Sequence, residues 1–239
     1  MRDIPDDPII RCAERTGYPP WLSKPQMDYC LDEWEEDEEE EEKSKFWSGA
    51  YEKPNEGSGT AADPYLIDTA EELAWSMLNG SKNTSRNMFY KLTADIYLND
   101  TEKVNWSTGD AVGDYAIKQW VPKFFSGTLD GNFHVIYGLY TDKNPASYTA
   151  SEANGVGFIT ENEWNYAANF KNLGFDYIYF HGPSSVGALA GNLKTGDNGK
   201  ITADRVFVGS NVTLKGQSVG GFIGYGGGAL ALSNCYSLV

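Results

Sequence analysis

A short phrase of valine, glycine and a large apolar residue recurs three times toward the carboxy terminus. The copies start at Val156, Val186 and Val219, so successive copies are 30 and 33 residues apart. Each phrase leads into a second apolar stretch, and these stretches also align with one another, at residues 170–175, 203–208 and 232–236. A period of about 20 to 50 residues is typical of solenoids and blade arrays. No other feature constrains the fold as strongly.

The repeating unit is too small for a propeller blade. Each unit holds two or three strand-like runs broken by Gly or Asn, whereas a blade needs four strands in about 40 to 45 residues. Units of this size cannot bury their own apolar face, so they stack and pair their backbones with the layers above and below. We therefore predict an all-β chain with a parallel β-helix, or β-solenoid, over residues 55–239. Its repeats span 155–185, 186–218 and 219–239.

The stretch 125–140 is expected to form the first full layer of this stack. Asp130, Gly131 and Asn132 lie at its centre, and Asp-Gly is a standard tight-turn pair. We therefore interpret these three residues as a structural turn at a corner and not as an active site. Alternation along the strand that follows is expected to place one set of side chains on a common face, namely Val135, Tyr137 and Leu139.

One segment upstream has the pattern of a helix. Thr69 followed by Glu72 is a capping-box pattern, and Gly80 supplies a stop. Between them, apolar residues recur at helical spacing on one side, namely Ala70, Leu73, Ala74 and Met77. A single helix beside a stack of strands is expected to cover its open end, because an uncovered end exposes apolar surface and unpaired backbone.

The chain before residue 55 differs in composition from the rest. Residues 1–31 contain five prolines, too many for a regular element of any length. Ten of the 34 acidic residues fall in residues 32–42, and without them the formal net charge of −15 would be −5. Because like charges repel, we predict that residues 32–54 form a disordered acidic linker. An acidic domain without clustered Lys or Arg is also a poor partner for nucleic acid.

Several of these segments, in this order, resemble one known family. The stretch 57–67, the helix, the strand at 93–96 and the stretch 125–140 resemble the amino-terminal part of right-handed β-helix surface proteins of bacteria. The phrases at 186–191 and 219–224 resemble the GLUG repeat of such proteins, while the first copy has Thr160 in place of the closing Gly. The resemblance covers residues 57–239. It implies a right-handed parallel β-helix in an adhesin-like protein that is secreted or on the cell surface, and it implies no particular ligand.

The amino terminus resembles a different group. Residues 5–20 are similar to the start of short proteins encoded in phage and prophage genomes of Gram-positive bacteria. That family closes in a Cys-x-x-Cys pair, whereas here only Cys12 and Cys30 are present, which argues against a metal site and leaves a disulfide between them open. The chain starts without the pattern of a signal peptide and holds no run of about 18 apolar residues, so we predict no membrane insertion. The first resemblance implies an extracellular or cell-surface location and the second implies a virion.

No catalytic motif stands out among the reactive side chains. His134 and His181 lie in or just after strands without nucleophile or metal-ligand spacing, so both are expected to be structural. Asp95 and Asp130 could form a catalytic pair for glycoside hydrolysis only if their carboxyl groups flank the glycosidic bond at the separation that this reaction requires. Cys235, in an apolar strand-like context, is expected to be a buried small hydrophobe. We predict no catalytic residue, no metal and no cofactor.

Four tyrosines are the candidate binding residues. Strand side chains switch faces at every residue, so some members of an aromatic strand point outward when their neighbours line the core. Outward aromatic side chains suit carbohydrate stacking or a protein contact, and they equally suit cross-strand pairing. The four candidates are Tyr137, Tyr140, Tyr177 and Tyr179. The apolar strand at 235–239 has no polar cap and predicts self-association through the final layer.

Three functions follow from these patterns. The foremost is a non-enzymatic binding or adhesion module of a bacterial surface-type protein, which presents a β-helix face to a glycan or a protein. The first alternative is a phage or prophage virion component such as a fibre or tail protein. The second alternative is a polysaccharide-processing β-helix enzyme.

Overall fold

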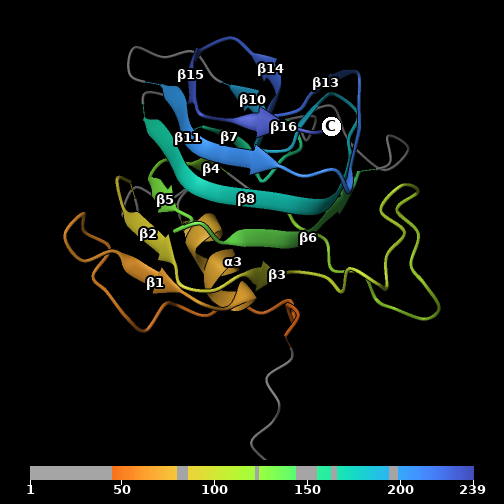
Figure 1. The fold of residues 1–239 in the computed structure, drawn as a ribbon, viewed down its shortest axis with the longest axis horizontal. Coiled ribbons are helices and arrows are strands. Elements are labelled where there is room, and N and C mark those ends of the chain that lie inside the picture. Colours follow the sequence, from red (N-terminus) through yellow and green to blue (C-terminus); the bar gives the residue numbers. More distant parts are fainter. Residues whose placement is uncertain (1–44, 80–85, 122–123, 144–154, 163–165, 194–198) are drawn as a thin grey trace, which may run out of the picture. The chain divides into compact units, whose positions relative to one another are not determined.

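The computed structural model describes residues 45–79, 86–121, 124–143, 155–162, 166–193 and 199–239 (Figure 1). The chain divides into two units, and the second, Lys45–Val239, is the domain that is considered below. The predictions for the proline-rich segment, for the acidic linker up to residue 44, for Cys12 and Cys30, and for Gly80 fall outside the described residues.

Within its described residues, the domain consists of strands and one helix, in the order shown in Figure 1. The elements are β1 (Tyr65–Ile67), α3 (Ala70–Asn79), β2 (Phe89–Leu92), β3 (Ile96–Tyr97), β4 (Phe124–Phe125), β5 (Thr128–Asp130), β6 (Val135–Asp142), β7 (Ile159–Asn162), β8 (Ala167–His181), β9 (Ser185–Gly187), β10 (Ala190–Leu193), β11 (Lys200–Val208), β12 (Val212–Lys215), β13 (Ser218–Gly220), β14 (Ile223–Gly226), β15 (Ala229–Ser233) and β16 (Tyr236–Ser237).

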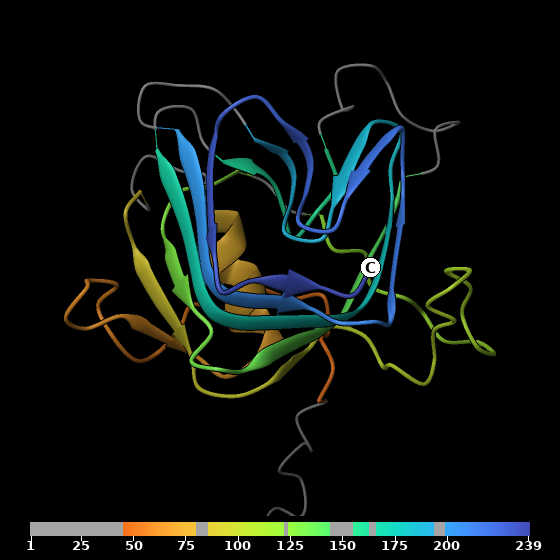
Figure 2. The same ribbon diagram turned by 45° about the horizontal axis from the view of Figure 1, so that its top comes forward.

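The named strands pair in parallel in three sheets. The largest sheet has the order β1-β2-β5-β8-β11-β15, with further strands paired beside this path. Two smaller sheets have the orders β14-β10-β7-β4 and β13-β9. In the turned view, β8 and β11 bend around one side of a ring, and the strands of the two smaller sheets complete the opposite side (Figure 2). The prediction of an all-β chain with parallel sheets is confirmed.

Residues at equivalent positions of the three repeats are neighbours in these sheets. Val156 bridges Val186, and Val186 pairs with Val219. Ile159 pairs with Ala190, one position out of step with the valines, because it lies three positions after Val156 whereas Ala190 lies four after Val186. The second stretches pair in the same way, and one row of partners runs through Phe170, Ala203 and Leu232.

The domain begins earlier than composition suggests. Trp47 is buried and its ring centroid lies 5.8 Å from that of Trp120. Phe46 forms a parallel bridge to Tyr97 in β3. Residues 45–54, which composition places in the linker, therefore belong to the domain, because their aromatic side chains bury apolar area against it.

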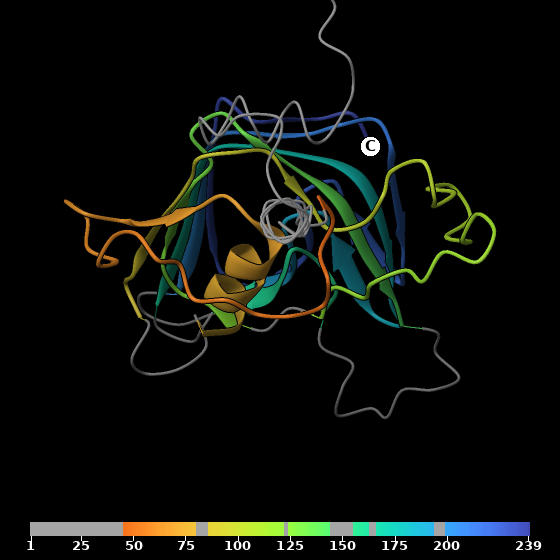
Figure 3. The same cartoon turned by 90° about the horizontal axis from the view of Figure 1, so that it is seen from below.

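The helix α3 forms as predicted and covers the core at the β1 end of the stack. The Glu72 N–H donates to the Thr69 hydroxyl at 3.3 Å, while the Glu72 carboxylate accepts from the Asp68 N–H at 3.0 Å. In a capping box the carboxylate would accept from the N–H of Thr69 itself, so the second bond is shifted by one residue. Seen from below, α3 lies inside the ring of strands (Figure 3). Its predicted apolar residues join the core, namely Ala70, Leu73, Ala74 and Met77.

Strict alternation along β6 was predicted and is wrong at one position. Leu139 is buried in the core together with Ile136, whereas Tyr137 points outward and is partly exposed. The cause is Gly138, whose φ of +77° resets the direction of the side chains that follow. A Cβ at Gly138 would overlap the backbone of Asn99 in the adjoining layer, so only glycine fits there.

Residues in the left-handed region line up at one corner of the stack. Asn172, Arg205 and Asn234 have φ values of 50°, 53° and 53°, and each lies at the same position between two runs of paired residues. Gly131 takes the equivalent position one layer earlier, next to Asn172. The predicted turn at Asp130-Gly131-Asn132 thus belongs to a corner that recurs from layer to layer.

Candidate functional site

Three tyrosines form a row on the outside of the large sheet, here called the outer tyrosine column: Tyr97, Tyr137 and Tyr177. Tyr97 in β3 pairs with Tyr137 in β6, and their rings are stacked with centroids 4.8 Å apart. The Tyr177 ring is 6.3 Å from that of Tyr137 and tilted by 56°. All three side chains are partly exposed. The column therefore presents ring edges and phenol hydroxyls to the outside.

Two further side chains lie at the ends of the column. The Lys45 ammonium nitrogen lies 3.7 Å from the centroid of the Tyr97 ring, a cation–π contact. At the other end, the Trp106 ring meets Tyr177 edge-on at 5.9 Å. The exposed surface thus combines three tyrosine rings with one cation, and Trp106, which is only 8% exposed, supports Tyr177 from below.

Tyr140 and Tyr179, the other two predicted binding residues, are buried. Their rings stack on each other at 5.2 Å and belong to a small apolar cluster with Val104 and Trp106. The loop 99–121 covers this cluster. A binding role for all four tyrosines stays a prediction, and their exposure favours Tyr137 and Tyr177.

The buried pair holds the covering loop to the sheet. The Tyr140 hydroxyl donates to the Gly109 carbonyl at 2.8 Å. Gly109 has a φ of +88°, and a Cβ there would collide with the Tyr179 ring. From the next layer, the Lys215 ammonium group donates to the Tyr179 hydroxyl at 3.1 Å. This anchoring fixes Trp106, and with it one end of the outer tyrosine column.

The Tyr137 and Tyr140 hydroxyls keep their protons at neutral pH, because the pKa of each is raised. Burial raises the pKa of Tyr137, and the nearby Asp95 carboxylate raises it further. Burial, followed by Asp142 and Tyr179, raises the pKa of Tyr140 to about 12. Each hydroxyl is therefore both a donor and an acceptor. The exposed members of the column can exchange hydrogen bonds with a neutral, hydroxyl-rich ligand.

The two histidines pair with carboxylates from adjacent layers. His134 Nδ1 lies 3.1 Å from the Asp95 carboxylate, which also accepts from the Val135 N–H at 3.0 Å. His181 Nδ1 lies 2.8 Å from the Asp142 carboxylate, its partner in the parallel register of β6 and β8. These contacts tie neighbouring layers together.

Asp130 belongs to a different network from Asp95. Its carboxylate accepts from the Asn132 N–H and from the Asn172 side chain, both at 2.9 Å, and lies 3.0 Å from the Lys171 ammonium group. Burial alone would raise the pKa of Asp130, but these bonds and Lys171 lower it overall. Asp130 is thus held ionised as part of the corner.

Other reactive side chains offer little chemistry. Within the described ranges, no group of three or more His, Cys, Asp or Glu could hold a metal ion. Cys235 is a free thiol of intermediate burial, packed against the core, and it donates to the Ala203 carbonyl at 3.4 Å.

Sequence reasoning missed part of this surface. Tyr97 carries a usable signal, since an Ile-Tyr dipeptide occurs at 96–97 and again at 136–137, in register with each other. Lys45 and Trp106 carry no comparable signal. Their positions at the two ends of the column depend on the packing of two segments that lack regular repeats.

Comparison with known proteins gives two partial matches. The chain is 30% identical over 168 residues to halomucin of Haloquadratum walsbyi, which covers 70% of this chain and 2% of halomucin. It is 32% identical over 137 residues to a provisionally named Gly-rich membrane protein of Evansella cellulosilytica, which covers 57% of this chain and 14% of that protein. The chain thus spans a small part of either relative. No family model matches it, and no solved structure matches it significantly.

Among the residues that the structure describes, no helix is long and apolar enough to cross a membrane.

Proposed function

We propose that the domain is a right-handed parallel β-helix module of an extracellular, surface-type protein, and that it binds glycans through the outer tyrosine column. Three parallel sheets with in-register repeats support the β-helix. Similarity to a Gly-rich membrane protein and to halomucin supports the surface location. The function proposed is adhesion and not catalysis.

The observation that carries the proposal is the spacing of the column. Its three rings follow one another across successive layers, with centroid separations of 4.8 Å and 6.3 Å, so phenol groups recur along the stack. A polysaccharide likewise repeats its hydroxyl groups along the chain. Ring edges carry positive partial charge, which suits sugar oxygens. Lys45 extends the row at the Tyr97 end, and the buried Trp106 supports Tyr177 at the other end.

A glycan array tests the proposal on the full chain. The chain is expected to bind at least one polysaccharide, and Tyr137→Ala should weaken that binding by about tenfold, or about 1.4 kcal/mol. Tyr137→Phe keeps the stacked ring and removes only the hydroxyl, so it should show an intermediate loss. The matched control is Tyr236→Ala, since Tyr236 is an exposed tyrosine stacked on Phe207 outside the column.

Two results would overturn the proposal. One is the absence of glycan binding together with binding of a protein that Tyr137→Ala abolishes, because the column would then be a protein contact. The other is glycan binding that Tyr137→Ala and Tyr236→Ala affect equally.

The absence of catalysis is tested separately. A bound polysaccharide is incubated with the chain, and its length distribution is followed by size-exclusion chromatography. We expect the distribution to stay constant, because the Asp95 and Asp130 carboxylates are engaged by His134 and Lys171 in separate networks. Appearance of shorter products that Asp95→Asn abolishes would contradict a pure binding role.

A further inference from the structure

The two smaller sheets meet backbone to backbone, and glycine makes this possible. A Cβ at Gly191 in β10 would overlap the backbone of Gly155 and Val156. A Cβ at Gly224 in β14 would overlap the backbone of Val186 in β9. The glycines that close the repeated phrase thus let one sheet approach the other more closely than side chains would allow.

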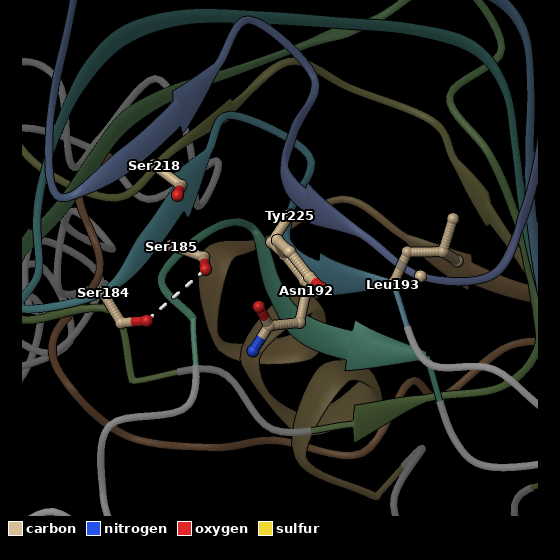
Figure 4. A pocket seen from close by; sticks show the side chains of 7 residues that line it. Ser184, Ser185, Asn192, Leu193, Ser218 and Tyr225 are labelled. Carbon is tan, nitrogen blue, oxygen red and sulfur yellow. Dashed lines mark hydrogen bonds between the residues drawn. The ribbon is translucent and has the colours of Figure 1, made fainter.

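Beside this contact lies a hollow of about 540 Å³, here called the intersheet groove. Its lining comes from both sheets and from the segments next to them: Ser184, Ser185, Asn192, Leu193, Ser218, Tyr225 and Gly227. Figure 4 shows the serines on one side and Asn192 with Tyr225 on the other. The volume lies within the range of about 300–1,000 Å³ that is typical of small-molecule sites.

The lining is polar but uncharged. None of its seven residues is Asp, Glu, Lys, Arg or His. Ser184 and Ser185 are 3.4 Å apart through their hydroxyls. Within the described part of the chain, neither the Asn192 carboxamide nor the Ser218 hydroxyl has a hydrogen-bond partner. These groups are free to bind a ligand that both donates and accepts.

Tyr225 adds an aromatic face to the groove. It is 61% exposed, and among the described residues its ring makes no ring–ring contact. Tyr137 differs in this respect, because its ring stacks against Tyr97. The register pairs Tyr225 with Asn192, so the free ring and the carboxamide lie side by side on one wall.

We propose that the intersheet groove is a binding subsite for a neutral saccharide of one or two sugar units. A free aromatic face covers the apolar side of a sugar ring, and uncharged hydroxyl and amide groups exchange hydrogen bonds with its hydroxyls. Because the lining has no charged side chain, it offers no counter-ion to the carboxylate of an acidic sugar. The groove lies between the smaller sheets, whereas the outer tyrosine column lies on β3, β6 and β8 of the large sheet. The two sites are therefore independent.

The test is a titration of the full chain, labelled at tyrosine, followed by NMR. The probes are cellobiose, maltose, lactose and N,N′-diacetylchitobiose at millimolar concentration, with galacturonic acid as the charged comparison. The Tyr225 ring signal, assigned by its loss in Tyr225→Ala, is expected to shift saturably with at least one neutral probe and not with galacturonic acid. In a parallel binding measurement, Tyr225→Ala and Asn192→Ala should each lower the affinity for that probe by about tenfold.

Variants elsewhere separate this subsite from the proposed function. Tyr236→Ala, an exposed tyrosine on β16, and Tyr137→Ala should both leave the Tyr225 shift unchanged. The glycan array can show no binding that depends on the outer tyrosine column while the Tyr225 signal still shifts with a neutral probe. In that case the proposed function is wrong and the binding subsite in the intersheet groove is retained. The groove assignment is overturned if no neutral probe shifts Tyr225, or if the shift persists in Asn192→Ala and in Ser218→Ala. Circular dichroism of each variant confirms that it is folded.

Discussion

Asn99 and Gly138 join two consecutive layers where β6 changes direction. The Asn99 side-chain amide donates to the Gly138 carbonyl at 2.9 Å, and Asn99 is fully buried. The Asn99 backbone lies where a Cβ on Gly138 would stand. This close approach brings both Ile136 and Leu139 into the core and leaves Tyr137 on the outside. The outer tyrosine column depends on this contact.

Gly138→Ala is expected to destabilise the domain by about 2–4 kcal/mol. Alanine at a φ of +77° is strained, and its Cβ would force the Asn99 backbone away. Urea unfolding followed by tyrosine and tryptophan fluorescence measures the loss as a lower midpoint.

Gly226→Ala is the matched control for that substitution. Gly226 also lies in a strand, β14, but a Cβ there meets no atom within 4 Å. Its free energy of unfolding should change by less than about 0.5 kcal/mol. Equal losses for the two variants would contradict the close approach of Asn99 and Gly138.

Asn99→Ala tests how the covering loop is held. The Asn99 carboxamide donates to the Lys118 carbonyl at 2.9 Å and accepts from the Lys118 N–H at 2.7 Å, in addition to its bond to Gly138. Losing these bonds leaves one buried and two partly buried backbone groups unpaired, so we expect a loss of about 2–3 kcal/mol. Limited proteolysis should cut the loop 99–121 faster than in the unchanged chain.

The control for the loop is Asn105→Ala. The Asn105 side chain accepts from the Ser107 N–H at 3.1 Å in an exposed turn of the same loop. Water replaces an exposed bond of this kind, so both stability and the rate of cleavage should change little. Faster cleavage in Asn105→Ala than in Asn99→Ala would show that the anchor lies elsewhere.

The stacking of the repeats could be predicted from the sequence, because it depends on a pattern that recurs at a fixed period. Val156, Val186 and Val219 occupy equivalent places in their units, and stacking brings equivalent places together. The change of direction in β6 could not be predicted in this way. It depends on Asn99, which lies 39 residues before Gly138 in the chain and meets it only in the folded stack.

The candidate sites were predicted less completely than the fold. Tyr137 and Tyr177 were selected as outward residues and are partly exposed. Tyr140 and Tyr179 are buried by the loop 99–121, whose polar composition gives little sign that it packs on the sheet. Tyr225 and the other residues of the intersheet groove are ordinary turn and strand residues. Only the close approach of the two small sheets brings them together.

Asp130 predicts a pH dependence of stability. Its pKa is lower in the folded domain than its ordinary value, so its contribution is fully present above an unfolded-state pKa of about 3.9. The contribution is lost as pH falls through that value toward the lower folded-state pKa. The stability difference between the unchanged chain and Asp130→Asn should therefore be largest near neutral pH and should shrink as pH falls below about 4.

Urea unfolding of both proteins across this pH range measures the difference. Asp114→Asn serves as the control, because Asp114 is an exposed loop carboxylate. It should change stability little at any pH. A difference for Asp130→Asn that grows as pH falls would contradict the stabilised carboxylate.

Exposed apolar side chains on β15 predict self-association. Leu232 continues the buried row through Phe170 and Ala203, and Leu230 pairs with the buried Ile201, yet the two leucines are 44% and 42% exposed. Another β-layer stacked on β15 would cover both leucines and would pair its backbone with the exposed edge of β15. We expect light scattering after size-exclusion chromatography to show an average mass that rises with concentration, through contact with a second copy of the chain.

Leu232→Lys should abolish this association, because a charge at the contact would have to be buried without a partner. Val112→Lys is the matched control, since Val112 is 49% exposed in the loop 99–121, away from β15. It should leave the association unchanged. A constant monomer mass for the unchanged chain at all concentrations would contradict the prediction, and equal loss of association in both variants would show that added charge acts through general repulsion and not at β15.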